Sequence, residues 1–201
     1  LDTAMPIQDP DRGNWGIGVH DGGVHALEAL VMARYYMFTQ VYFNLIGKVL
    51  ELHFTEWLDG AGHRWSTRPA EFLEQDDVST LAAMRQSSDP HARAVVERDY
   101  YPLAFESGEH LSAAETERLQ AVIEEVKPQF PAHQVLVSRA AKDPHRFEQD
   151  RVWVAADDGS VTPIQEASHF IGHLERIDRF RVYAPRERID EVAAAMRHGL
   201  D

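Results

Sequence analysis

The stretch from Val24 to Trp57, VHALEALVMARYYMFTQVYFNLIGKVLELHFTEW, decides the fold of this chain. Its apolar residues recur at spacings of three and four, which is the pattern of a helix with one buried face. We therefore predict one long amphipathic helix over residues 24–57, ended by Gly60 and Gly62. The apolar stripe consists of Leu27, Leu30, Val31, Phe38, Val41, Tyr42, Leu45, Val49 and Leu52.

Further helices are predicted before residue 130. The clearest covers residues 111–126, because Ser112 and Glu115 have the spacing of a capping box. The others are predicted over residues 65–84, with Pro69 in the first turn, and from Asp89 to about Asp99.

The pattern changes after Pro131, where short alternating runs rich in Val and aromatic residues predict strands. Residues 1–22 carry several Pro and Gly residues and are interpreted as extended or loop. The predicted fold class is α+β, with a mainly helical region over residues 1–130 and a small lobe with an antiparallel sheet over residues 131–201. The strands are expected at 133–141, 150–157 and 178–185, and a closing helix at 186–199.

Composition limits the classes of function. The 201 residues carry a formal charge of −13, so binding of nucleic acid is not expected and any anion site must be a local cluster of Arg and Lys. The absence of Cys excludes disulfides and thiolate metal sites, which fits a cytoplasmic protein. No apolar run has the length needed to cross a bilayer, so no membrane partner is expected.

An adjacent His20-Asp21 pair raises the question of a phosphohydrolase metal site, in which such a pair lies within a helix. Here Gly22 and Gly23 follow directly, and two successive glycines disfavour a helix. We therefore interpret Asp21 as a helix cap for the amides of residues 23 and 24, and His20 as a loop residue.

A second histidine pair, His169 and His173, is spaced by one helical turn and could chelate a metal with Glu166. The Glu does not lie between the two histidines, as it does in zinc proteases, and no base that could activate a water is evident. We favour a structural role for this pair and keep a metal-dependent hydrolase as the third and weakest hypothesis.

Arg34 lies within the apolar stripe, where a guanidinium needs an anionic partner. That partner is either a carboxylate, such as Glu28 or Glu51, or a phosphate held by the planar guanidinium. The sequence does not separate these two alternatives. The neighbouring aromatic residues could stack on a sugar or base, although positions in the core are favoured; they are Tyr35, Tyr36, Tyr42 and Phe43.

The segment Gly22–Asn44, GGVHALEALVMARYYMFTQVYFN, resembles the HD-superfamily phosphohydrolases of the SAM- and HD-domain deoxynucleotide triphosphohydrolase family. In that family a long helix after the catalytic core has the form ARxxMxxxVYxHK. A weaker, pattern-level similarity extends over nearly the whole chain. The matching residues of the helix are Ala33, Arg34, Met37, Val41 and Tyr42.

The resemblance implies that Arg34 contacts the triphosphate and that Tyr42 packs on the deoxyribose, so both are candidate substrate-binding residues. It also implies that the metal ligands precede this helix, so the chain is expected to be the C-terminal portion of a longer enzyme, or a relative that lost its catalytic half. No catalytic residue and no metal ligand is assigned to this chain. A divalent metal (Mn, Mg, Fe or Zn) is expected only in the full-length enzyme.

Two departures from the family pattern affect regulation. Asn44 and Leu45 replace the usual His-Lys, and Gln40 replaces an arginine that lies near a regulatory nucleotide. Because these changes remove cations, regulation by a bound nucleotide is not expected. The first hypothesis is the C-terminal region of a dNTP triphosphohydrolase-like enzyme, inactive by itself, with a nucleotide ligand and homo-oligomer contacts. The alternative is a non-catalytic oligomerisation or protein-interaction module.

Overall fold

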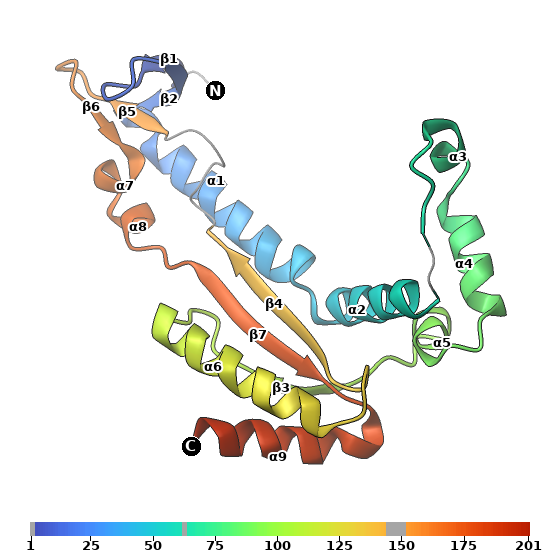
Figure 1. Cartoon of the computed structure of the whole chain (residues 1–201). Coiled ribbons are helices and arrows are strands. Elements are labelled where there is room, and N and C mark those ends of the chain that lie inside the picture. Colours follow the sequence, from blue (N-terminus) through green and yellow to red (C-terminus); the bar gives the residue numbers. More distant parts are fainter. Residues whose placement is uncertain (1–2, 62–63, 144–151) are drawn as a thin grey trace. The chain divides into compact units, whose positions relative to one another are not determined.

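The computed structural model of the chain describes residues 3–61, 64–143 and 152–201 and has an α+β fold (Figure 1). Contacts divide the chain into two compact units. Unit 1 combines residues 1–42 with residues 141–177, and unit 2 combines residues 43–140 with residues 178–201. Each unit is therefore built from two stretches that are far apart in sequence.

Unit 1 contains a four-stranded sheet with the order β1-β2-β5-β6. Strands β1 (Ala4–Gln8) and β2 (Trp15–His20) form an antiparallel hairpin, so the N-terminal segment contains strands and not only loops. Strand β5 (Trp153–Ala155) pairs with β2 in parallel and with β6 (Val161–Pro163) in an antiparallel arrangement. Of the predicted strand at 150–157, residues 150 and 151 lie outside the described residues.

Helix α1 (Val24–Met37) supplies the other half of the core of unit 1. Its residues Leu27 and Val31 pack with Val154 of β5. Two short helices complete this cluster, α7 (Ile164–Ala167) with Ile164 and α8 (His169–Gly172) with Ile171.

The predicted single helix over residues 24–57 is wrong, because the chain breaks near its middle. After α1, residues Phe38–Tyr42 form a π-helical turn, and a separate helix α2 spans Leu45–Gly60. The side chain of Asn44 accepts hydrogen bonds from the amides of Ile46 at 3.0 Å and Gly47 at 3.1 Å, so it caps the new helix. The apolar pattern therefore continues through Asn44, although this residue begins a second helix.

Unit 2 is organised around a three-stranded sheet with the order β3-β7-β4. The strands are β3 (Leu103–Glu106), β7 (Ile177–Tyr183) and β4 (Leu136–Lys142), and β3 is antiparallel to β7. Successive side chains of β7 point to opposite faces of the sheet. Phe180 and Val182 pack in the cluster on one face, and Tyr183 packs with Val49 of α2 on the other.

Two amphipathic helices, α6 (Ala113–Val126) and α9 (Ile189–Leu200), lie side by side against the sheet of unit 2 (Figure 1). The predicted capping box of α6 is confirmed, because the side chains of Ser112 and Glu115 each bond to the other's backbone amide. Together with Val192 and Met196 of α9, this helix forms the largest buried cluster of the unit.

The predicted helix over residues 65–84 is also wrong in its extent. The structure has a short helix α3 (Pro69–Leu73) and a separate helix α4 (Asp77–Gln86), because Asp76 forms its own capping box with Ser79. Helix α5 (Pro90–Val96) begins after the cap Asp89, as predicted, and ends before Asp99. Short 3-10 turns lie at Asp21–Gly23, Lys127–Gln129 and Arg186–Arg188.

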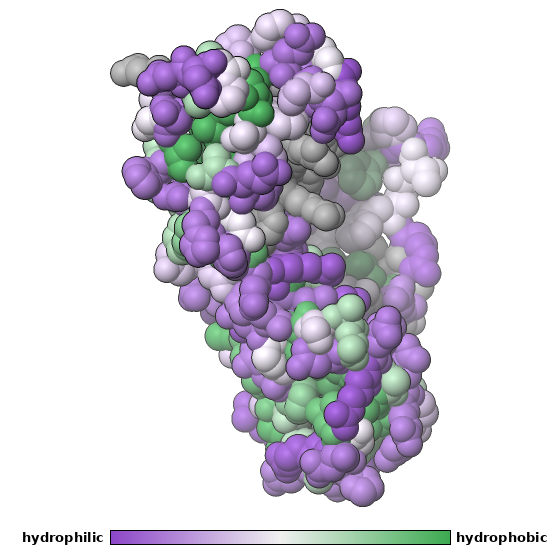
Figure 2. Space-filling view, turned by 90° about the vertical axis from the view of Figure 1, so that its left-hand side faces the viewer, coloured by the Kyte–Doolittle hydropathy of each residue, from purple (hydrophilic) through white to green (hydrophobic). Residues whose placement is uncertain are grey.

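The face of the molecule in Figure 2 is mostly hydrophilic, with hydrophobic residues between the polar ones. Within the described ranges, no helix is both long enough and apolar enough to cross a bilayer.

Candidate functional site

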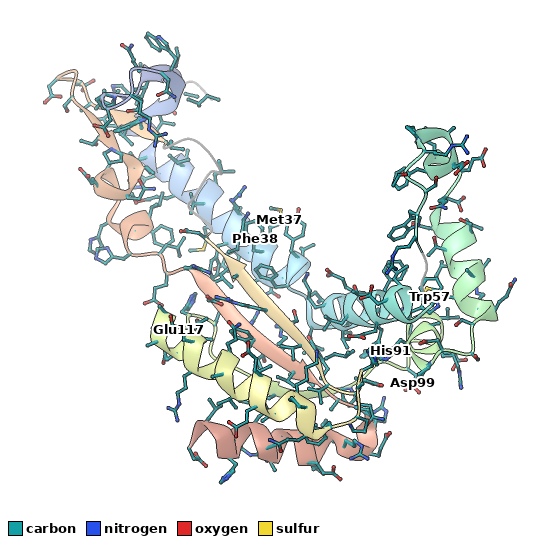
Figure 3. All side chains as sticks on the ribbon, in the orientation of Figure 1. Met37, Phe38, Trp57, His91, Asp99 and Glu117 are labelled. Atoms are coloured by element: carbon teal, nitrogen blue, oxygen red, sulfur yellow. The ribbon has the colours of Figure 1, made fainter. Side chains whose placement is uncertain are left out.

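The candidate site lies in unit 1, where α1 passes into its π-helical turn. We define the cation–aromatic cluster as Arg34, Phe38, Tyr42 and Lys142. The guanidinium carbon of Arg34 lies over the ring of Phe38, 5.1 Å from its centroid, and the ring of Tyr42 is 5.4 Å from the same centroid. Figure 3 shows Phe38 at the end of α1. The helical spacing of four residues places these three side chains in sequence along one face.

Lys142, at the end of β4, joins the cluster from a distant part of the chain. Its Nζ lies 5.4 Å from the centroid of Phe38. Each cation gains from the negative face of the aromatic ring, but two cations that approach one ring also repel each other. The cluster thus brings two positive charges beside one aromatic ring, and an anionic ligand would be attracted to both.

Tyr42 supplies the exposed side of the cluster. It is 54% exposed, and Tyr36 is 55% exposed, so the interior position favoured for these aromatic residues is wrong for both. An exposed phenol that contacts Phe38 offers a flat apolar surface and a polar tip to a ligand. The structure therefore brings the two candidate residues Arg34 and Tyr42 together through Phe38.

The carboxylates considered as partners of Arg34 both have other contacts. Glu28 accepts hydrogen bonds from the hydroxyl of Ser168 at 2.5 Å and from His25 at 2.9 Å, and these bonds lower the pKa of Glu28. Glu51 pairs with Lys48 at 2.7 Å.

The His20-Asp21 pair has a structural role at the C-terminal end of β2. Nε2 of His20 is 3.0 Å from a carboxylate oxygen of Asp157, in the turn between β5 and β6, and Nδ1 is 2.7 Å from Asp21. Asp21 lies in the 3-10 turn before α1 and accepts from the amide of Gly22 at 2.6 Å, and the N-cap of α1 is Gly23, so the prediction that Asp21 caps this helix is wrong. Helix α1 begins without a side-chain cap.

The second pair, His169 and His173, is held by local contacts. Nδ1 of His173 donates to the backbone carbonyl of His169 at 2.8 Å, and the centroids of the two imidazole rings are 4.0 Å apart. Across residues 3–61, 64–143 and 152–201, no group of three or more His, Asp or Glu side chains is arranged to hold a metal ion.

Two members of the cluster were missed by sequence reasoning, for different reasons. Phe38 could have been found, because it lies four residues after Arg34 and four before Tyr42 in a helical stretch. Lys142 carries no such signal, since only the chain path through β4 places it beside Phe38.

Comparison with solved structures shows the same fold in larger proteins. A hypothetical protein from Aquifex aeolicus matches 90% of this chain with a TM-score of 0.73 and 20% sequence identity. A phosphohydrolase from Bacteroides thetaiotaomicron matches 90% of this chain with a TM-score of 0.58 and 16% identity. The match covers 47% and 54% of these two chains, so the present chain spans about half the length of each.

A search of the curated proteins finds no match to this chain. A family model described as "HD associated region" matches residues 14–201, which is nearly the whole sequence. The chain therefore belongs to the HD associated region family.

Proposed function

We propose that this chain is the nucleotide-positioning, C-terminal region of a dNTP triphosphohydrolase-like HD phosphohydrolase. The observation that carries the proposal is the convergence of Arg34, Lys142 and Tyr42 on the ring of Phe38. The family membership and the similarity of fold to a named phosphohydrolase support it.

Each residue of the cluster has a distinct role in this proposal. Arg34 holds the triphosphate through its planar guanidinium, and Lys142 adds a second positive charge. Tyr42 packs its ring against the deoxyribose. Phe38 holds the cations and the tyrosine in place, so the chain binds and orients the nucleotide.

Hydrolysis to nucleoside and triphosphate would need a water activated by a divalent metal. The described residues offer no cage for that metal, so we assign the metal site to a segment outside this chain. By itself the chain is expected to bind nucleotide weakly and to hydrolyse none. The residues of this chain bind and orient the nucleotide and do not hold the metal.

The test uses nuclear magnetic resonance of the labelled chain with three probes: dGTP, tripolyphosphate and deoxyguanosine. We expect tripolyphosphate to shift the side-chain signals of Arg34 and Lys142, deoxyguanosine to shift those of Tyr42, and dGTP to shift all three. Shifts confined to residues outside unit 1, or none at millimolar dGTP, would contradict the proposal. Steady hydrolysis of dGTP with Mn²⁺ would reveal a metal site and overturn the assignment of chemistry to another segment.

A second candidate function is a homo-oligomerisation module, and it rests on a different observation. Helices α3 and α4 expose large apolar side chains, including Leu73 at 81% and Val78 at 74%. Exposed apolar groups that gather on neighbouring elements favour contact with another protein surface. Light scattering coupled to size exclusion would show a dimer or larger assembly, and an assembly that ignores nucleotides would favour this second function.

A further inference from the structure

Unit 2 buries a pair of histidines that the proposed function does not use. His53 on α2 is 0% exposed and His91 on α5 is 6% exposed, and their Nδ1 atoms are 2.8 Å apart. Because both rings present the same atom to each other, only one proton can lie between them. The pair is thus a single hydrogen bond that joins two helices.

The neighbouring backbone determines which ring carries that proton. The amide of Tyr101 donates to Nε2 of His53 at 3.1 Å, so this nitrogen is an acceptor and carries no proton. In a neutral imidazole the proton must then be on Nδ1 of His53, which donates to Nδ1 of His91. His91 in turn keeps its own proton on Nε2.

An additional proton has no acceptable place in this arrangement. On Nδ1 of His91 it would set two N–H groups against each other across 2.8 Å. On Nε2 of His53 it would oppose the amide of Tyr101. Protonation of either ring therefore breaks one of the two hydrogen bonds, and a buried group that loses its partner is costly.

The surroundings of the pair allow protons to reach it from one side. His91 lines a pocket of 240 Å³, together with Glu56 of α2, Asp89 at the start of α5 and His133 of the loop before β4. Burial lowers the pKa of His53 to about 4, with a smaller contribution from His91. Burial also lowers the pKa of His91, and His133 adds to this, while Asp89 and Glu56 act in the opposite direction.

Tyr101 also faces the pair, with its ring centroid 4.5 Å from that of His53. Burial raises the pKa of Tyr101, as do the charges of Glu187, Glu56 and Asp89, so it stays protonated in acid. The Glu56 carboxylate is in turn paired with His133. Since burial lowers the pKa of both His53 and His91, both rings of the pair are neutral at pH 7.

The helices joined by this pair share one apolar cluster. Trp57 of α2 is 3% exposed and packs with Met84 of α4 and Ala92 of α5. Figure 3 shows Trp57 and His91 where α2 meets α5. Separation of α5 from α2 would expose the indole of Trp57 to water.

We propose that the His53–His91 pair is an acid-sensitive latch between α2 and α5, which opens when the pair takes up an additional proton. This device regulates the docking of α5, and through the shared cluster that of α4, without a ligand.

Nitrogen-15 spectroscopy of the histidine rings of the whole 201-residue chain tests the starting state. At pH 7.5 we expect His53 protonated on Nδ1 alone and His91 on Nε2 alone. Between pH 7.5 and 4, ring protonation and the loss of amide protection in residues 90–96 should share one midpoint, below pH 6.5. A His53 ring protonated on Nε2 at pH 7.5 would overturn the latch, as would protonation without any change in α5.

A matched substitution tests the role of the second ring. His91→Asn keeps an acceptor near the position of Nδ1 and removes one titrating group, so the opening midpoint should move to lower pH and the transition should involve fewer protons. His198→Asn, on the exposed face of α9, is the control and should leave the midpoint unchanged. Equal midpoints for His91→Asn and the unmodified chain would overturn the latch; if His91→Asn fails to fold, the ring spectroscopy alone decides.

Discussion

The guanidinium carbon of Arg34 lies 5.1 Å from the centroid of the Phe38 ring. The ring supports the side chain through a cation–aromatic contact. In the proposed nucleotide complex the planar guanidinium binds phosphate oxygens, and charge-assisted hydrogen bonds of this kind are typically worth about 1.5–3 kcal/mol.

Arg34→Gln should therefore weaken the binding of tripolyphosphate by about 10-fold or more. Arg34→Lys should lose less, because it keeps the charge and loses the bidentate geometry. Titration calorimetry or the resonance shifts described above would measure both. Arg85→Gln on α4 is the control, because this residue is exposed and lies outside unit 1; equal losses for Arg34→Gln and Arg85→Gln would refute the role of Arg34.

Tyr42→Ala should weaken dGTP binding by about three- to tenfold, which corresponds to one aromatic contact. Its affinity for tripolyphosphate should stay unchanged, since the ring is assigned to the sugar. Tyr36→Ala offers a closely matched control, because Tyr36 is 55% exposed and Tyr42 is 54% exposed. A loss of tripolyphosphate affinity in Tyr42→Ala would show that the phenol acts on the phosphates instead.

Asn44→Ala should lower the free energy of unfolding by about 1 kcal/mol, because it removes the side-chain acceptor for the amides of Ile46 and Gly47. Asn44→Asp should restore most of that loss, since Asp is an equally good cap. Urea unfolding followed by circular dichroism would measure both variants. If the alanine variant is as stable as the unmodified chain, the two amides have found another acceptor and the break between α1 and α2 is not set by the cap.

Leu73→Glu combined with Val78→Glu should convert any dimer that forms through α3 and α4 into a monomer. Both side chains are mostly exposed, so the stability of the monomer should change by no more than about 0.5 kcal/mol. Light scattering across a concentration series would measure the assembly. Ile17→Glu on β2, where Ile17 is 76% exposed, is the matched control and should leave the assembly intact; dissociation by the control alone would place the interface in unit 1.

Stability should fall as the pH decreases from about 6.5 to 4. Burial lowers the pKa of His53 to about 4, below its value in the unfolded chain, so the unfolded state binds more protons in this window. The stabilisation is fully present above pH 6.5 and is lost progressively as the pH falls, by up to about 3 kcal/mol.

Urea unfolding at pH 7, 5.5 and 4.5 would measure this loss in the unmodified chain and in His53→Gln. The variant should be less stable at pH 7, and its stability should depend less on pH over the same window. A variant with an unchanged pH dependence would assign the loss to other groups, such as the carboxylates.

Local features of the fold could be predicted from the sequence because their causes are local. The capping box of α6 needs only Ser112 and Glu115, and the start of α5 needs only Asp89 followed by Pro90. The same local chemistry was overlooked at Asn44 and Asp76. At Asn44 the apolar periodicity continues through the cap and predicts one helix where the chain forms two.

The sequence by itself determined the α+β class, most of the helix-forming segments and the helical caps at Ser112 and Asp89. Only the tertiary structure decided that β2 pairs with β5 in parallel, that Lys142 reaches Phe38, and that His53 meets His91. Caps and helical spacing act within a few residues, so the sequence carries them directly. Contacts between distant residues depend on which buried faces pack together, and that choice is made by the whole chain at once.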